Sequence, residues 1–438
     1  MYRAVDSFFS VLNTKTKIII QTPNRRSFGD GANEMYFGLL KAKREKKKVL
    51  FVYPRFFVFK RLGFLVVNPE LFKLESELTI PSNGFLGFFL GCLLNFYLLL
   101  LFLIQQARSS KIFQRICKKL WPIIDYDYGY VSSRIGRLDL WKPHDVKFFS
   151  VDILENQKWS EQHRSFNPMR IKESKRSFAE SQKVKLGVPS NAWFVCLHCR
   201  EIQDRPARNV TLNNYIDGIK TITDKGGWVV RLGHTNMPPL PEMERVVDYA
   251  HSPLKSPLLD LYLISECRFF IGHSSGPNVI PNLLKKPVLL VNMTDWSASL
   301  LLKKGDLAIM KHVFSHSKNR FLGIKEVLEE PSLVQVYGEP LGDYELIENS
   351  SKEILEAIEE FLERDGNYKY SSLQIKYNEA RMKEIKIRFE NGDPQFAPGI
   401  SNDTLYIEKY RIGADLYADG TLCNGYLQNN WLKDCNNV

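Results

Sequence analysis

The chain has 438 residues, which is too long for one compact domain and sufficient for two domains with a tail. Its composition, 44% hydrophobic and 25% charged, excludes a disordered protein. The net charge of +11 is uneven, because residues 1–188 carry 32 basic and 16 acidic side chains, whereas residues 189–438 carry 28 and 33. The basic half predicts an anionic partner: a membrane, a lipid headgroup or a nucleic acid.

The N-terminal segment reads as a βαβ unit. A buried strand is predicted at 17–21, a turn at 24–31, a helix over 33–47 and a second strand at 49–53, with 64–67 as a candidate third strand. This order implies a parallel sheet. Asp30 lies in the turn between Gly29 and Gly31. A carboxylate there could act as a general base, or it could form an Asx turn or a helix cap.

Residues 85–104 (FLGFFLGCLLNFYLLLLFLI) form the most apolar stretch, twenty residues without a charge. Three alternatives remain: a membrane span, a buried core helix, or a helix lying in the membrane interface. A span would place the βαβ unit and the later strands on opposite sides of the membrane. An interfacial helix fits the basic half best, because Arg108, Lys111, Arg115, Lys118 and Lys119 follow it. We therefore expect membrane-surface contact through 85–120.

The second half has the clearest pattern. We place a domain boundary at 188/189, after a helix at 173–185 and its stop at 186–191. Apolar strands then alternate with helices: strands at 194–199, 228–232, 246–250, 268–272 and 288–291, and helices at 212–225, 258–265 and 278–284. This alternation predicts a doubly wound parallel sheet over 189–348. Residues 349–438 are predicted as helices at 351–364 and 370–390, followed by a packed tail.

Polar residues follow the strands of this predicted sheet. Gly272, His273, Ser274, Ser275 and Gly276 come after one strand and open a helix, as in phosphate-binding turns, or Ser serves only as a helix cap. Parallel strands place their ligands at the carboxyl edge. Three further groups reach this edge, although each alone is more often structural: His198 and Arg200, then Arg208 and Asn209, then Arg231.

A metal site is not predicted. Cys196, His198 and Cys199 are close in sequence, but a strand does not place all three on one face, and no second Cys/His cluster follows. The seven cysteines, an odd number without regular spacing, indicate reduced thiols in a cytoplasmic protein, and the start of the chain has no signal-peptide pattern.

Three segments together resemble bacterial glycosyltransferases of surface-polysaccharide clusters: FVCLHCRE at 194–201, GWVVRLG at 227–233 and RFFIGHSSGPNVI at 268–280. The resemblance covers roughly 165–365. Gly29-Asp30 is similar to the Gly-Asp loop of ADP-heptose–lipopolysaccharide heptosyltransferases, where the aspartate is the proposed base. His198 and Arg200 are similar to the His-x-Arg of protein O-fucosyltransferases, whose arginine contacts the diphosphate. His273 departs from the acidic residue or threonine that is commoner in the heptosyltransferases.

The resemblance implies a GT-B fold, an α/β architecture with two Rossmann-like domains whose parallel sheets face each other across a cleft. It also implies transfer from a nucleotide sugar to a glycan or lipid-linked acceptor, with inversion and without metal. His198, Arg200, Arg208, Asn209, Arg231, His273, Ser274, Ser275 and Gly276 would bind the donor, and Asp30 would be the catalytic base. The protein would then be peripheral on the inner face of a bacterial cytoplasmic membrane.

Two other classes of function remain. One is a sugar-nucleotide epimerase of the same fold, which would need acid and base groups from both domains around one sugar. The other is a non-catalytic, membrane-associated scaffold. Nucleic-acid binding is disfavoured, because basic and aromatic residues do not interleave on a recognisable module.

Overall fold

A computed structural model of the chain describes most of residues 189–348 and less than half of residues 1–188. The described residues are 17–21, 23, 28–53, 67–93, 95–96, 162–163, 166, 168–201, 206–294, 303–330, 333, 342–364, 368–391 and 420–431. The predictions on 97–120 and nearly all of 125–167 therefore lie outside the described residues.

The N-terminal βαβ unit is confirmed. β1 (Ile18–Gln21), α2 (Phe28–Arg44) and β2 (Lys48–Phe51) follow one another, and β1 pairs with β2 in parallel. The third strand is β3 (Thr79–Ile80), which pairs in parallel with β2; the candidate at 64–67 falls almost entirely outside the described residues. The short helix η2 (Leu71–Lys73) precedes β3.

Residues 189–348 contain the predicted parallel sheet. Its strands are β4 (Phe194–His198), β5 (Trp228–Leu232), β6 (Val246–Val247), β7 (Phe270–Gly272), β8 (Val288–Met293) and β9 (Leu307–Met310). A seventh strand, β13 (Thr421–Leu422), is added from the tail. The order is β6-β5-β4-β7-β8-β9-β13, and every pairing is parallel. The predicted packed tail thus completes one edge of this sheet.

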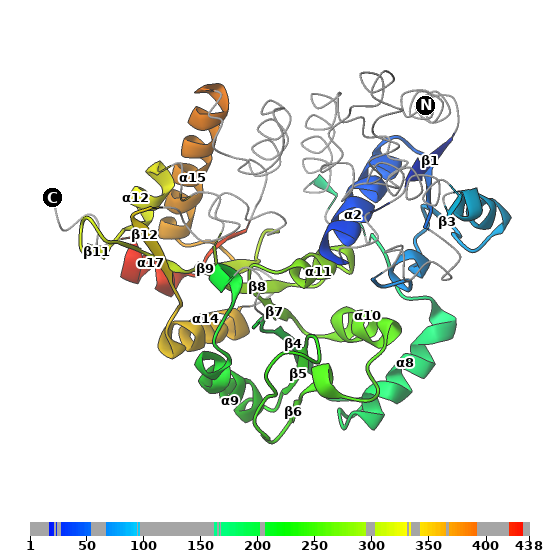
Figure 1. Cartoon of the computed structure of the whole chain (residues 1–438), viewed down its shortest axis with the longest axis horizontal. Coiled ribbons are helices and arrows are strands. Elements are labelled where there is room, and N and C mark those ends of the chain that lie inside the picture. The colour runs from blue at the N-terminus through cyan, green and yellow to red at the C-terminus, as the bar shows by residue number, and fades with distance from the viewer. Residues whose placement is uncertain are drawn as a thin grey trace, which may run out of the picture.

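Helices cover both faces of the sheet. α9 (Ile216–Asp224), extended at its start by η4 (Leu212–Tyr215), packs with α14 (Ser351–Glu363) on one side. α8 (Glu173–Lys185), α10 (Pro257–Glu266) and α11 (Ile280–Leu283) lie on the other side, and α2 packs against α11 (Figure 1). α15 (Ser372–Asn391) and α17 (Asn424–Asn430) pack together beside β13 and α14. Ser350 and Glu353 form a capping box at the start of α14.

The apolar stretch is helical where it is described, over 85–93 and 95–96. Six large apolar side chains there are exposed: Phe85, Leu86, Phe88, Phe89, Leu93 and Phe96. The buried-core alternative is therefore wrong for this part of the stretch. Among the described residues, no helix combines the length and apolarity that crossing a bilayer requires.

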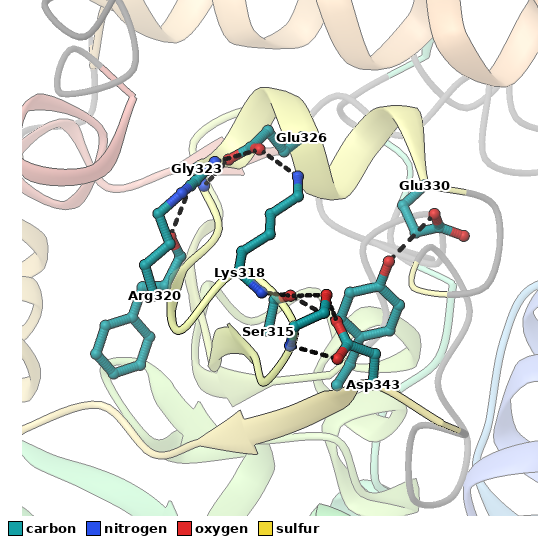
Figure 2. Close-up of polar contacts among 10 residues, drawn as sticks. Ser315, Lys318, Arg320, Gly323, Glu326, Glu330 and Asp343 are labelled. Carbon is teal, nitrogen blue, oxygen red and sulfur yellow. Dashed lines mark hydrogen bonds and ion pairs between the residues drawn. The ribbon is translucent and has the colours of Figure 1, made fainter.

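A small antiparallel sheet was not predicted. It contains β10 (His312–Ser315), β11 (Arg320–Phe321) and β12 (Tyr344–Ile347), in the spatial order β11-β10-β12. Along the chain, α12 (Ile324–Glu329) lies between β11 and β12. Figure 2 shows how its turns are held. The Glu326 carboxylate accepts bonds from Lys318 and Arg320, each at 2.8 Å, and Asp343 accepts from the hydroxyl of Ser315.

Glu326 should make this region sensitive to acid. The hydrogen bond from Arg320 is the main cause that lowers the pKa of Glu326 to about 2. A carboxylate with a depressed pKa stabilises the fold above its unfolded pKa, near 4.5, and loses that contribution as the pH falls towards 2. We expect Glu326→Gln to cost about 1 kcal/mol at pH 7, because the group is partly exposed, and almost nothing at pH 2.

Urea unfolding at the two pH values measures this effect. Glu329→Gln is the matched control, because Glu329 lies on the same helix and its ion pair with Lys325 is exposed and long, at 3.8 Å. An equal loss of stability in both variants would contradict the role given to Glu326.

Candidate functional site

The strand order of the parallel sheet reverses between β4 and β7. The chain continues from β4 to β5 and β6 in one direction, and from β7 to β8 and β9 in the other. Open parallel sheets bind ligands where the order reverses in this way, just beyond the carboxyl ends of the two strands. His198 ends β4, and His273 directly follows β7. The predicted site residues of these two strands therefore meet at the switch point of the sheet.

Two stacked histidines form the floor of this switch-point site. The rings of His198 and His273 lie with centroids 5.2 Å apart and planes 14° apart. Both are buried, with 5% of His198 and none of His273 exposed. The backbone N–H of Arg200 donates to Nε2 of His273 at 2.8 Å. Because Nε2 accepts, a neutral His273 carries its proton on Nδ1.

Both histidines are held in the neutral form. Burial is the largest cause that lowers the pKa of His198 to about 3, with further lowering from the charges of Arg231 and Arg200. Burial also lowers the pKa of His273 well below its usual value, aided by His198 and Arg208. The Nδ1 atoms of both rings are buried without a hydrogen-bond partner in the part of the chain that the structure describes. Buried polar atoms in this state are typical of sites that a ligand or water completes.

Positive charge surrounds the histidines. Arg200 is 7% exposed, and the guanidinium of Arg208, on η3 (Pro206–Arg208), donates through Nε to the carbonyl oxygen of Ser274 at 2.5 Å. Nζ of Lys311 donates to the carbonyl oxygen of Asn209 at 2.8 Å. The predicted residues Arg200, Arg208, Asn209 and Ser274 are thus brought together, and Lys311 joins them.

Lys311 was missed by sequence reasoning. It directly follows β9 and is only 3% exposed, so its ammonium is a buried cation near His273. A signal was present, since a lysine after the apolar run Leu307–Met310 marks the carboxyl end of another strand. Thr294 directly follows β8 and was missed because that strand was predicted to end at 291, whereas it continues to Met293.

The serines of the predicted phosphate turn have different surroundings. The hydroxyl of Ser274 accepts bonds from the backbone N–H of Thr294 at 2.9 Å and from its hydroxyl at 3.1 Å, so it ties the turn to β8. Ser275 is extended and precedes the short helix η6 (Gly276–Val279), but its side chain makes no capping bond. The helix-cap alternative is therefore wrong for Ser275.

Arg231 has the contacts of a structural ion pair. Its guanidinium is 1% exposed, and Nη1 lies 3.1 Å from the carboxylate of Asp248. Asp248 also accepts bonds from the backbone N–H of Leu240 and from Nδ1 of His251, each at 2.9 Å. The charge of Arg231 acts on His198, yet its described bonds hold β5 to the segment after β6.

The N-terminal unit touches the switch-point site at Gly29. The predicted turn at 24–31 is partly helical, because α2 begins at Phe28, so Gly29 and Asp30 lie in its first turn. A Cβ atom on Gly29 would lie 2.4 Å from the carbonyl oxygen of Gly276, so the two backbones are in direct contact. This packing explains why the helix begins earlier than predicted, since tertiary contact overrides the preference of glycine for loops. The side chain of Asp30 lies outside what the structure describes.

Neither a group of metal ligands nor a similar known protein indicates the function of this site. Among the described residues, no group of three or more His, Cys, Asp and Glu side chains is placed to hold a metal ion. Comparison with protein-family models, curated proteins and solved structures finds no match for the chain. The functional argument therefore depends on the geometry of the switch-point site and on its chemistry.

Proposed function

We propose that the chain is a glycosyltransferase that binds a nucleoside diphosphate sugar at the carboxyl ends of β4 and β7. The observation that carries this proposal is the meeting of His198, Arg200 and His273 at the topological switch point, where the charges of Arg208 and Lys311 also act on His273. Dinucleotides and nucleotides bind at this position in doubly wound sheets. A sugar nucleotide fits better than a small neutral ligand, because the cations suit a diphosphate.

The diphosphate would interact with Arg200, Arg208 and Lys311. Guanidinium groups bind phosphate oxygens in pairs, and a buried ammonium adds a point charge. The missing side chain of Gly276 leaves room for the start of α2, since a Cβ atom there would lie 3.4 Å from the backbone nitrogen of Gly29. The three cations would stabilise the negative charge that develops on the leaving diphosphate, a role that other transferases give to a divalent cation.

The second half of the reaction would use the N-terminal unit, as in a two-domain GT-B arrangement. The acceptor hydroxyl oxygen would attack the anomeric carbon from the side opposite the diphosphate, and the bond from that carbon to the diphosphate oxygen would break. The nucleoside diphosphate leaves with the bonding electron pair. We assign the role of base, which receives the hydroxyl proton, to Asp30. Asp30 lies in the first turn of α2, next in the chain to Gly29, whose backbone contacts Gly276.

A thermal-shift screen against nucleoside diphosphates and sugar nucleotides, without added metal, tests the binding step. A ligand at about 100 times its Kd stabilises the fold by about 2.7 kcal/mol, which raises the melting temperature visibly. We expect one nucleotide to produce this shift and Arg200→Ala to abolish it. Arg268→Ala is the matched control, because Arg268 lies at the opposite edge of the same sheet, stacked 4.8 Å from the ring centre of Trp193.

Two outcomes would contradict the proposal. No shift with any nucleotide would favour the scaffold alternative. Conversion of a sugar nucleotide to its epimer with no acceptor present would favour the epimerase. If the proposal holds, Asp30→Asn keeps the nucleotide shift and loses transfer.

A further inference from the structure

A basic cavity lies apart from the switch-point site, in the N-terminal unit. Its volume is about 870 Å³, and it shares no lining residue with that site. It is formed by the ends of β2 and β3 and by two segments that flank the sheet, 72–77 and 163–175. Its inner wall includes buried apolar side chains, among them Phe51, Phe72 and Met169.

The cavity carries an excess of positive charge. Its lining contains five lysines and arginines and two glutamates: Lys43, Lys73, Arg170, Lys172, Lys175, Glu75 and Glu77. Both glutamates are paired, Glu75 with Lys172 at 3.5 Å and Glu77 with Lys43. Glu70, which lies outside the lining, pairs with both Lys73 and Lys175, so five cations face three carboxylates. In the described part of the chain, the exposed guanidinium of Arg170 has no carboxylate partner, while its backbone is fixed by two bonds to Glu75. The surplus of positive charge in the cavity can bind an anionic group.

The exposed apolar helix follows part of the cavity lining directly in the chain. Pro81, Ser82 and Asn83 line the cavity, and the helix starts two residues later. The hydroxyl of Ser82 donates to the carbonyl oxygen of Phe72 at 2.9 Å. A Cβ atom on Gly87 would lie 2.2 Å from the carbonyl oxygen of Ser82, so the helix packs tightly on this turn. The apolar helix is therefore held beside the basic cavity.

We propose that this cavity binds the phosphate-bearing headgroup of an anionic membrane lipid, while the helix at 85–96 inserts its exposed face among the acyl chains. Phe85 is 88% exposed and Phe96 is 69% exposed, an arrangement that costs free energy in water and gains it in lipid. The two features are complementary to the two parts of a lipid, an apolar tail and a charged head. The net charge of +16 over residues 1–188 has the sign that attracts such a surface.

Vesicle sedimentation of the full chain tests the proposal. We expect binding to phosphatidylglycerol vesicles, weak binding to phosphatidylcholine vesicles, and a decline with salt. Arg170→Glu combined with Lys172→Glu should weaken the binding about tenfold or more, since each basic residue near an anionic surface contributes severalfold. Phe85→Ser combined with Phe88→Ser should weaken binding to a similar degree.

Matched controls separate this site from general charge and hydrophobicity. Lys325→Glu with Lys352→Glu reverses two exposed lysines elsewhere, and Phe178→Ser removes an exposed aromatic side chain on α8. Both should bind vesicles like the wild type. If the double reversal lowers the melting temperature, Arg170→Gln tests the same charge, because Arg170 is exposed and its side chain makes no described ion pair.

Three results would overturn the proposal: equal binding to both vesicle types, unchanged binding of the cavity and helix variants, or equal loss in the controls. Soluble glycerol phosphate that raises the melting temperature, without any vesicle binding, would reassign the cavity to a free anion. The proposal does not depend on the proposed transfer activity. The cavity variants should keep the nucleotide shift of the wild type, so the failure of one proposal is distinguishable from the failure of the other.

Discussion

Gly29→Ala should reduce the proposed sugar transfer about a hundredfold while leaving most of the proposed nucleotide binding intact. The added Cβ atom would meet three backbone atoms of Gly276 at 2.4 to 2.8 Å, and backbone cannot move aside as a flexible side chain can. The start of α2 must therefore shift away from η6, and Asp30 shifts with it. A displacement of about 1 Å at reacting groups can cost about a hundredfold in rate.

Gly29→Ala should also lower the free energy of unfolding. Overpacking of this kind costs about 1–3 kcal/mol, which denaturant unfolding measures. Gly425→Ala is the matched control, because Gly425 also lies in the first turn of a helix, α17, but its Cβ would meet only a carboxylate oxygen at 3.9 Å. Alanine there should stabilise the helix slightly. Wild-type stability and transfer in Gly29→Ala would show that α2 and η6 do not need this contact.

The sequence predicted the central sheet well because its strands are continuous apolar runs. β4, β5 and β8 are buried along almost their whole length, so their signal does not depend on partners far away in the chain. The same pattern showed which polar residues end the strands. This is why His198, Arg200 and His273 could be named before their contact was known.

The remaining features depend on contacts that no local pattern contains. β13 has two residues and becomes a strand only by pairing with β9, more than one hundred residues earlier. The helical start of α2 depends on Gly276, far along the chain. Arg231 ends a strand like its neighbours, but Asp248 neutralises it. Sequence patterns therefore predict which side chains reach the edge, whereas packing decides which of them remain available for a ligand.

Acidification should destabilise the protein through the two stacked histidines. A histidine that is buried in its neutral form takes up a proton more readily in the unfolded chain, near pH 6.5, than in the fold. For His198, whose pKa falls to about 3, stability is therefore lost progressively as the pH falls from 6.5 to 3. His273 acts in the same direction. Each histidine contributes up to about 1.4 kcal/mol per pH unit.

Urea unfolding between pH 7 and pH 4 measures this slope. His198→Asn with His273→Gln should lower stability at pH 7, since the stack and the bond from Arg200 are altered, but should flatten the slope by up to about 2.7 kcal/mol per pH unit. His234→Asn, at an exposed histidine beyond the carboxyl end of β5, is the control for the removal of a histidine. A double variant as acid-sensitive as the wild type would mean that other groups dominate the titration. Such a result would also contradict the inference that His198 and His273 are held neutral at the proposed site for an anionic ligand.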